Sequence, residues 1–423
     1  MEKKVIWSLL LFIIGVSTNV TVGQDILVPM DETQSDHLKA YGVTFWALER
    51  DIPVDWLLNY QGGAFLFAQQ PEIESELRVR GVSYRILNGS QTASIVSSVE
   101  SDAENTSMVR LEKPPRIAVY APDQTLPWDD AVLLALTYAE VPYEMIYDDQ
   151  VLRGDLEDYD WLHLHHEDFT GQYGKFFNYR ATPWYIEQQR QAEVSARSHG
   201  FRKVSDLKRQ VVSVIREYVG GGGFLFAMCS GTDTFDIALA AHQTDVVPAE
   251  YDGDPIDPDA LSSMDFANTF AFSDFRPTFN AREYEHSNID AGPPPPQLRN
   301  PAVDYFTLFE FSAKYDQVPT MLTQNHVPTI KGFIGQTTNF RKSIIKSNVV
   351  ILAEAPGRDE VRYLHGTFGE GTFTFYGGHD PEDYQHFVGD PPTDLNLHKH
   401  SPGYRLILNN ILFPAAKKKK QKT

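Results

Sequence analysis

The stretch that decides the fold is Gly220-Gly221-Gly222-Gly223-Phe224-Leu225-Phe226-Ala227-Met228-Cys229-Ser230-Gly231-Thr232-Asp233. Residues 204–219, which precede it, carry apolar side chains at helical spacing, and glycine tolerates the left-handed conformations that end a helix. The apolar run 224–228 is typical of a strand covered on both faces. Small residues after Cys229 offer an N-cap for a second helix. The stretch therefore predicts a helix, a buried strand, a sharp corner at Cys229 and another helix.

A cysteine at such a corner has the setting of a nucleophile elbow, which lifts a side chain above the carboxyl end of a sheet. The helix N-terminus favours the thiolate of Cys229, and the N–H groups of Ser230 and Gly231 are candidate donors to an oxyanion. Cys229 is the only cysteine in the chain, and the alternative interpretation is a small buried apolar residue.

The composition allows a large core and argues against one class of partner. The chain has 423 residues, of which 42% are hydrophobic, so it is long enough for two domains. Its formal charge is −20, from 37 basic and 57 acidic residues, and such a chain lacks the basic field that nucleic acids require. We therefore predict no nucleic-acid partner. A single cysteine cannot form an internal disulfide.

Residues 1–24 have the pattern of a secretory signal peptide. A charged start, Met1-Glu2-Lys3-Lys4, precedes the apolar run 5–16, and small or polar residues follow up to Gln24. The apolar run is too short for a comfortable membrane span, and no cysteine follows it to carry a lipid. We expect a secreted or periplasmic protein without a transmembrane span after cleavage; an uncleaved N-terminal anchor is the alternative. Residues 416–423 form a basic tail that we expect to be disordered.

The rest of the chain divides into two modules. Residues 25–110 predict a small α+β module, and the Ser- and Glu-rich segment 90–113 predicts a linker. From 114 to 415 strands and helices alternate, which favours an α/β domain with a mostly parallel sheet and helices on both faces. Its expected strands are 116–120, 143–147, 160–165, 224–228, 349–353, 361–363 and 371–376, and its expected helices include 128–140, 204–219 and 404–412. Residues 250–315 lack periodicity and predict an irregular insertion or lid.

A cysteine nucleophile needs a base, and the best candidate is His379. It follows the expected strand 371–376, so it should lie at the same sheet edge as Cys229. Glu382, three residues later, is close enough to orient the imidazole.

With this elbow and the late strand–His-x-x-Glu, residues 114–415 resemble the class I glutamine amidotransferase-like fold, a flavodoxin-like α/β arrangement. The resemblance implies that Cys229 attacks a carboxamide while His379 and Glu382 act as base and orienting acid. Ala227 stands where that family usually has glycine. The acid lies one residue further on, in a form closer to the trehalose-utilisation-type (ThuA-like) relatives.

The whole chain further resembles a group of secreted Bacteroidota proteins labelled asparagine synthetase B. The chain has neither an N-terminal-cysteine glutaminase nor the Ser-Gly-Gly-x-Asp-Ser loop of an ATP-pyrophosphatase. An exported protein would also lack ATP. The resemblance therefore supports the fold and the compartment, and ATP-dependent asparagine synthesis is not expected.

A second group of polar residues ends the expected strand 160–165. His163 and His165 alternate onto one face and are a weaker candidate pair for a metal ion. His166, Glu167 and Asp168 are expected to line the pocket, where related folds place a second oxyanion donor. Three other histidines are expected at the surface, namely His286, His398 and His400.

These residues predict an exported protein that hydrolyses a C–N bond through Cys229, without a cofactor. Its expected ligand is a small amide, an amino acid or a sugar-like molecule. Two alternatives remain: a non-catalytic ligand-binding or envelope scaffold protein with a sugar-binding pocket, and a metal-dependent hydrolase centred on His163 and His165.

Overall fold

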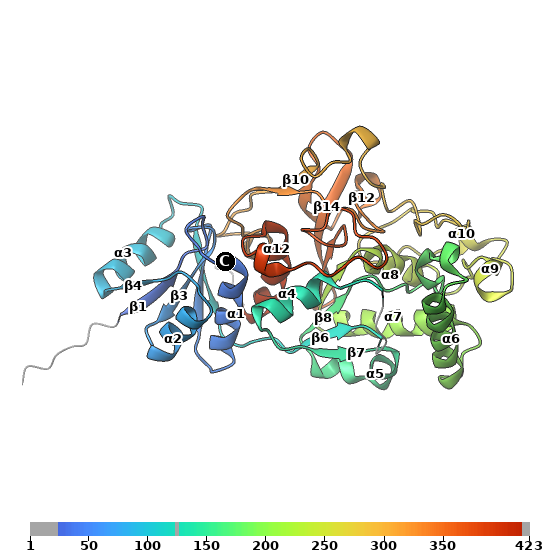
Figure 1. The fold of residues 1–423 in the computed structure, drawn as a ribbon, viewed down its shortest axis with the longest axis horizontal. Coiled ribbons are helices and arrows are strands. Elements are labelled where there is room, and N and C mark those ends of the chain that lie inside the picture. The colour runs from blue at the N-terminus through green and yellow to red at the C-terminus, as the bar shows by residue number, and fades with distance from the viewer. Residues whose placement is uncertain (1–23, 123–126, 417–423) are drawn as a thin grey trace, which may run out of the picture.

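The computed structural model describes residues 24–122 and 127–416, and it contains two sheets (Figure 1). The predicted signal peptide, except Gln24, and the basic tail, except Ala416, lie outside these residues. The first sheet is antiparallel, with the strand order β4-β1-β3-β2-β5, and lies at one end of the molecule. Its elements are β1 (Asp25–Val28), α1 (His37–Leu48), β2 (Val54–Leu58), β3 (Ala64–Ala68), α2 (Pro71–Val79), β4 (Arg85–Leu87), α3 (Gly89–Val99) and β5 (Ser107–Leu111).

The segment predicted as a linker is part of this sheet's module, so that prediction was wrong. Helix α3 begins with a capping box, in which the Asn88 side chain accepts the Gln91 N–H and the Gln91 side chain accepts the Asn88 N–H. Strand β5 then pairs with β2 along its whole length. The serines suggested a linker, but the helix cap and the pairing of β5 organise the segment.

The second sheet has ten strands among the described residues and is mixed. Its parallel half runs in the order β15-β9-β8-β6-β7. The strands and helices of this half are β6 (Ile117–Tyr120), α4 (Ala131–Ala139), β7 (Glu144–Ile146), α5 (Asp148–Arg153), β8 (Trp161–Leu164), α6 (Pro183–Ser198), α7 (Val204–Gly220), β9 (Phe224–Met228), α8 (Ser230–Ala240) and β15 (Gly371–Tyr376). Strand β6 alternates between two cores: Ile117 and Val119 face that of α4, whereas Ala118 and Tyr120 face that of α7. Helices thus cover both faces.

The other half of the sheet is antiparallel, which corrects the expectation of a mostly parallel sheet while leaving the α/β class intact. Its strands are β10 (Tyr305–Leu308), β11 (Thr329–Lys331), β12 (Phe340–Arg341), β13 (Val350–Glu354) and β14 (Glu360–Phe368). Only Gly369 and Glu370 join β14 to β15, and so short a connection permits only an antiparallel pair.

The remaining α-helices lie in or just beside the insertion and near the C-terminus. They are α9 (Ala249–Asp252), α10 (Ala260–Ser263), α11 (Gln317–Leu322) and α12 (Pro402–Leu412). Helix α12 contacts α1 and α4, and it lies between the two sheets in Figure 1. Its Arg405, fully buried, donates hydrogen bonds to the carbonyls of Met30 (2.9 Å) and Gly62 (2.8 Å) in the first module.

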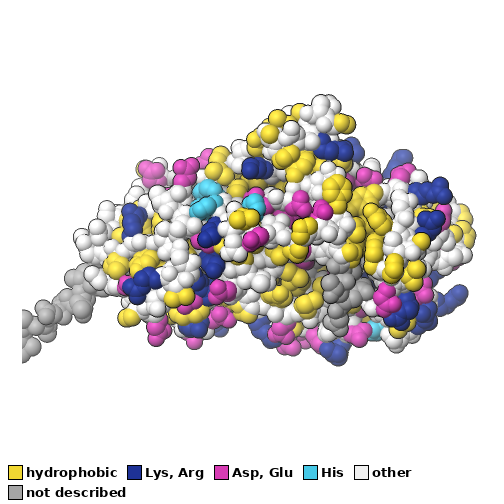
Figure 2. All heavy atoms as spheres, in the orientation of Figure 1, with side chains coloured by type: hydrophobic (Ala, Val, Ile, Leu, Met, Phe, Trp, Pro, Cys, Tyr) yellow, Lys and Arg dark blue, Asp and Glu magenta, His cyan; other side chains and the backbone are white. Residues whose placement is uncertain are grey.

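No helix in the described parts of the chain has both the length and the apolar character needed to cross a membrane. Acidic and basic side chains are intermixed on the face shown in Figure 2, without one continuous basic area. That distribution agrees with the expectation of no nucleic-acid partner, which stays a prediction.

The order of the parallel strands marks where a ligand site is expected. Strand β6 has β7 on one side and β8 on the other, although β7 and β8 both follow it in the chain. In open α/β sheets, such a reversal opens a crevice at the carboxyl ends of the strands. The segments that follow β6, β8, β9 and β15 meet at this edge.

Candidate functional site

The corner after β9 has the strained backbone of an elbow. Cys229 is buried at 2% exposure and has φ +48° and ψ −136°, a conformation that non-glycine residues rarely adopt. Its Sγ accepts the N–H of Gln336 at 3.3 Å. The N–H of Gly231 donates to the carbonyl of His165 at 2.5 Å, and a Cβ on Gly231 would lie 2.4 Å from that oxygen. Only glycine therefore fits where α8 meets the end of β8.

The thiol of Cys229 is not activated by this setting. Burial raises its pKa to about 11, although the N–H groups of Thr337, Gln336 and Ser230 oppose the rise. The thiol form therefore predominates at neutral pH. The helix N-terminus alone does not reproduce the thiolate that the sequence predicts.

The structure brings His379 to the expected edge but does not assemble the expected triad. Tyr376 pairs with Met228, so Cys229 and His379 leave neighbouring parallel strands at the same end. Glu382 Oε2, however, lies 3.1 Å from Nδ1 of His398. No hydrogen bond or ion pair within residues 24–122 and 127–416 joins His379 to Cys229 or to Glu382.

His379 instead belongs to a group of five side chains that we call the imidazole cluster: His165, His166, His379, His386 and Asp129. The ring of His379 lies 4.7 Å from that of His165, measured between centroids, and it stacks on His386 at 4.6 Å with only 2° between the planes. The cluster draws on the segments after β6, β8 and β15. It therefore occupies the edge where the crevice is expected.

Most polar atoms of the cluster lack a hydrogen-bond partner although they are buried. The unpartnered atoms are Asp129 Oδ1, both ring nitrogens of His165, Nδ1 of His166, Nδ1 of His379 and Nε2 of His386. Leaving one buried polar group unpaired typically costs about 1–3 kcal/mol. Burial, together with the neighbouring imidazoles, lowers the pKa of His166 to about 3 and that of His379 well below its usual range. His166 and His379 are thus held in the neutral form, and the cluster presents several buried ring nitrogens without a hydrogen-bond partner.

Two further carboxylates, those of Asp130 and Asp383, each lie beside one histidine of the cluster. Asp130 Oδ1 lies at ion-pair distance, 3.2 Å, from Nδ1 of His165, without a hydrogen bond between the two atoms. Asp383 Oδ2 accepts a hydrogen bond from Nδ1 of His386 at 2.9 Å. Each carboxylate thereby leaves Nε2 of its histidine turned away from it.

The predicted metal pair His163 and His165 lies together with Asp130 in one group of possible metal ligands, but the two rings differ in their partners. Nδ1 of His163 lies 3.2 Å from the carbonyl of Phe226, and its Nε2 lies 3.2 Å from Asp130 Oδ2. Both ring nitrogens of His163 are therefore engaged. His165 alone of this pair has a nitrogen without any partner.

The sequence did not single out Asp129, Asp130 or His386. Asp129 and Asp130 directly precede α4, where Asp130 accepts the N–H groups of Val132 and Leu133 as an N-cap. The signal that could have found the two aspartates is a carboxylate pair that follows the first strand of an α/β domain. His386 lies in an irregular loop, and no periodic pattern marks it.

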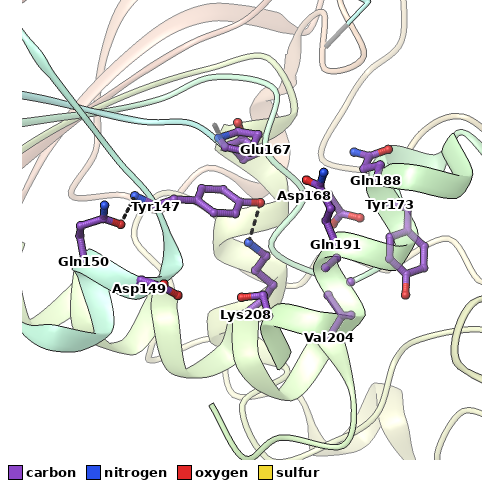
Figure 3. Close-up of a pocket in the computed structure, with 14 residues that line it drawn as sticks. Tyr147, Asp149, Gln150, Glu167, Asp168, Tyr173, Gln188, Gln191, Val204 and Lys208 are labelled. Carbon is purple, nitrogen blue, oxygen red and sulfur yellow. Dashed lines mark hydrogen bonds between the residues drawn. The ribbon is translucent and has the colours of Figure 1, made fainter. Parts of the chain in front are cut away.

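A pocket of about 270 Å³ opens beside the cluster, lined by residues that follow β6, β7 and β8 and by α6 and α7 (Figure 3). At its wall Lys208 Nζ contacts Asp148 Oδ1 at 2.8 Å and the hydroxyl of Tyr147 at 3.2 Å. Burial raises the pKa of Glu167, which also lines the pocket, to about 8. Glu167 Oε1 is 4.0 Å from Nε2 of His166, so this residue connects the pocket to the cluster.

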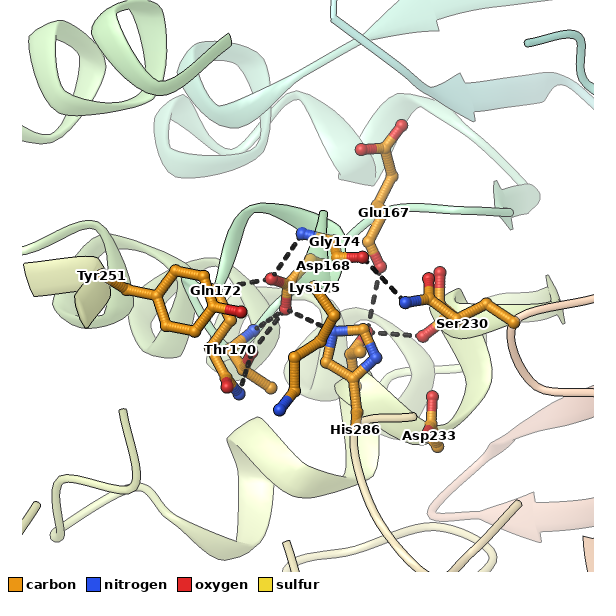
Figure 4. Close-up of polar contacts among 12 residues, drawn as sticks. Glu167, Asp168, Thr170, Gln172, Gly174, Lys175, Ser230, Asp233, Tyr251 and His286 are labelled. Atoms are coloured by element: carbon orange, nitrogen blue, oxygen red, sulfur yellow. Dashed lines mark hydrogen bonds and ion pairs between the residues drawn. The ribbon is translucent and has the colours of Figure 1, made fainter. Parts of the chain in front are cut away.

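The predicted pocket residue Asp168 organises a separate polar network, shown in Figure 4. Its carboxylate accepts the N–H groups of Thr170, Gln172 and Gly174 and lies 3.6 Å from Nε2 of His286. His286 was expected at the surface, but it is buried at 1% exposure and no ring nitrogen has a hydrogen-bond partner. The insertion folds back over α8, which is why an irregular segment supplies a buried histidine.

No protein-family model matches the chain, and no curated protein matches it significantly. Among solved structures 34 chains match. One cytoplasmic protein from Salmonella typhimurium is 9% identical over 72% of this chain and 100% of its own, with a TM-score of 0.36. Another, from Salmonella typhimurium LT2, is 12% identical over 71% and 99%, with a TM-score of 0.35. A catalytic mutant of a GH42 β-galactosidase from G. stearothermophilus is 10% identical over 63% and 28%, with a TM-score of 0.26. At these scores the likenesses carry no conclusion about activity.

Proposed function

We propose that this protein hydrolyses a C–N bond in a small amide at the carboxyl edge of its parallel strands. The observation that carries the proposal is the imidazole cluster, whose unpartnered nitrogens converge at the strand-order reversal. Imidazoles and carboxylates are the side chains that enzymes use to activate water. The reaction adds one water across the C–N bond and yields a carboxylic acid and an amine.

The adjoining pocket supports a small polar substrate. Its volume of about 270 Å³ lies near the lower end of known ligand sites. Its lining includes the amides of Gln150, Gln188 and Gln191, and Gln188 Oε1 is buried without a partner. An amide, an amino-acid derivative or a sugar-like molecule fits these donors and acceptors.

A second route to the same reaction uses Cys229 as the nucleophile. It is favoured by the strained elbow, and it is the route implied by the resemblance to class I glutamine amidotransferase-like and ThuA-like proteins. In this route Cys229 Sγ attacks the carbonyl carbon, His379 takes the thiol proton, and the Ser230 N–H holds the oxyanion. The C–N bond then breaks as His379 passes that proton to the leaving amine, and one water releases the carboxylic acid from the thioester. It requires His379 and Glu382 to move from their present partners.

Export remains part of the proposal. The pattern of residues 1–24 supports cleavage near Gln24, and β1 begins at Asp25. Mass spectrometry of the protein recovered from a periplasmic or culture fraction should give a chain that begins near Gln24. Recovery of the uncleaved chain in the membrane fraction would favour the N-terminal anchor.

The function is tested with the full chain and a panel of primary amides, N-acyl amino acids and amino sugars, by assaying the released ammonia or amine. We expect turnover by the wild type and by Cys229→Ala, and a loss of at least about 100-fold in His379→Gln. His242→Gln, which changes an exposed histidine, is the matched control. Loss of turnover in Cys229→Ala would instead support the route in which Cys229 is the nucleophile. Ligand-induced thermal stabilisation without any turnover would support the non-catalytic binding protein and overturn the proposal.

A further inference from the structure

We propose that the imidazole cluster binds a divalent transition-metal ion of the zinc class, with His165, His166 and His379 as its ligands. Asp129 and His386 lie beside these ligands, in a second group of possible ligand atoms that also includes His379. The inference rests on the proposed function for its chemical role, whereas metal binding itself is tested independently.

The spacing of the donors fits such a site. One ring nitrogen from each of the three histidines lies within 4.8 Å of the others, and the same limit holds for Asp129, His379 and His386. Zinc–nitrogen bonds of about 2.0–2.1 Å in a tetrahedral site place the donors roughly 3.3 Å apart. Small rotations of the side chains therefore suffice to bring the three imidazoles onto one ion.

The unpartnered atoms provide a second, independent observation. The side chains of His165 and His379 are more than nine-tenths buried, and each has a ring nitrogen without a hydrogen-bond partner. Such nitrogens need either a donor or a metal. Imidazoles that face one another cannot all satisfy each other, because a neutral ring supplies only one N–H and a charged ring offers no acceptor.

The two carboxylates behind the cluster match the usual support of a metal-binding histidine. Ligating imidazoles commonly direct their second nitrogen at a carboxylate, which fixes the tautomer and the ring orientation. Asp130 faces Nδ1 of His165 at 3.2 Å, and Asp383 accepts the Nδ1–H of His386. Nε2 of His165 is thereby left to bind the ion, whereas Nε2 of His386 faces Asp129 Oδ1 at 3.4 Å.

The donor types select the class of metal. Imidazole nitrogens suit zinc, copper, nickel and iron, whereas magnesium and calcium prefer oxygen donors. The chain holds a contrasting group of three carboxylates, Asp245, Asp252 and Asp254, but there Lys203 Nζ lies within ion-pair distance of all three. That group already contains a cation of the chain itself, whereas no ion pair among the described residues joins a lysine or arginine to the imidazole cluster.

An ion held by three imidazoles keeps one position open for water, as catalytic zinc sites do. Such a bound water loses its proton near neutral pH, and Asp129 is placed to receive it. The resulting hydroxide would add to the amide carbon. The proton on Asp129 would pass to the leaving nitrogen as the C–N bond breaks, so the overall change is again the addition of one water.

The test is metal analysis of the full chain, purified without a histidine tag, stripped with a chelator and titrated with Zn²⁺ in a calorimeter. Co²⁺ serves as a spectroscopic probe, because its visible absorption reports tetrahedral nitrogen ligation. We expect one equivalent of Zn²⁺ and an affinity at least about 100-fold lower in His165→Gln and in His379→Gln. His242→Gln is expected to bind like the wild type.

Circular dichroism of each variant shows whether it has folded. Replacing a buried histidine can unfold the chain. Two measurements therefore leave His165 and His379 unchanged: Zn²⁺ titration of His386→Gln and the Co²⁺ spectrum of the wild type. Absence of stoichiometric binding by the wild type, or equal binding by all folded variants, would overturn the metal site. Metal binding without amide hydrolysis would leave the site standing and refute the proposed function. Hydrolysis that survives complete metal removal would refute the catalytic role of the ion and leave the proposed function standing.

Discussion

The Asp383 carboxylate accepts a hydrogen bond from Nδ1 of His386 at 2.9 Å and leaves the opposite ring nitrogen, Nε2, facing Asp129 Oδ1 at 3.4 Å. The imidazole of His386 is thus held between two acids. If the cluster binds a metal, Asp383 fixes this ring without touching the ion.

Asp383→Ala should therefore weaken Zn²⁺ binding by about 10-fold or less, the lower end of the effect of removing a carboxylate behind a ligating histidine, because His386 lies beside the three proposed ligands and is not one of them. Calorimetric titration of the wild type and the variant measures the difference. Asp359→Ala removes an exposed carboxylate and is the control. An unchanged affinity in Asp383→Ala would place His386 outside the metal site.

The Cys229 thiol should react slowly in the folded protein. With its pKa raised to about 11, the thiolate fraction at pH 7.5 is roughly 300-fold smaller than for a thiol of pKa about 8.5. Iodoacetamide labelling followed by intact mass measures the rate, with the same protein in urea as the control. Fast labelling with a midpoint below 8.5, lost in His379→Ala, would support the cysteine route instead.

Arg405→Met should loosen the contact between the two modules. The change leaves the carbonyls of Met30 and Gly62 without their buried donor, so we expect a loss of about 3 kcal/mol or more in unfolding free energy. Urea denaturation and limited proteolysis of the first module measure it. Arg110→Met removes a partly exposed ion pair with Asp55 and should cost less than about 1 kcal/mol. Equal effects of the two variants would contradict the role of Arg405.

His365 should make the protein more sensitive to acid. Burial lowers the pKa of His365 to about 4, so its neutral form stabilises the fold fully above pH 6.5, and this contribution declines as the pH falls toward 4. Between pH 7 and pH 5 the loss is about 2 kcal/mol.

His365→Gln lacks this term, so its stability relative to the wild type should rise by about that amount between pH 7 and pH 5. Urea midpoints at the two pH values measure the change, and His242→Gln is the control. A stability difference that does not vary with pH would show that His365 does not titrate in this range.

Local patterns predicted the elements around the elbow well. The strand 224–228 and the corner at Cys229 are confirmed, because a buried apolar run bounded by glycines and small residues leaves few alternatives. The prediction that His379 and Cys229 lie at the same sheet edge is confirmed as well. Strands β15 and β9 are parallel neighbours, so the residues that follow them emerge at the same end.

Contacts between distant segments could not be predicted in the same way. Glu382 is near His379 in sequence, yet it pairs with His398 from the following loop. Asp129 and His386 are 257 residues apart and come together only because β6 and β15 belong to one sheet. Neither residue lies on a periodic element, so no local pattern marks its partner.

The position of β15 has a consequence for how the chain acquires its structure during synthesis. Strand β9 has β8 on one side and β15 on the other, and about 140 residues separate β9 from β15 in the chain. Until the ribosome has released β15, one edge of β9 lacks its partner, and unpaired edges invite association with other chains. His379, His386 and the α12 contact with α1 also belong to this last part. Both the candidate site and the joint between the modules must therefore be completed after most of the polypeptide has emerged, and a nascent chain would need protection until then.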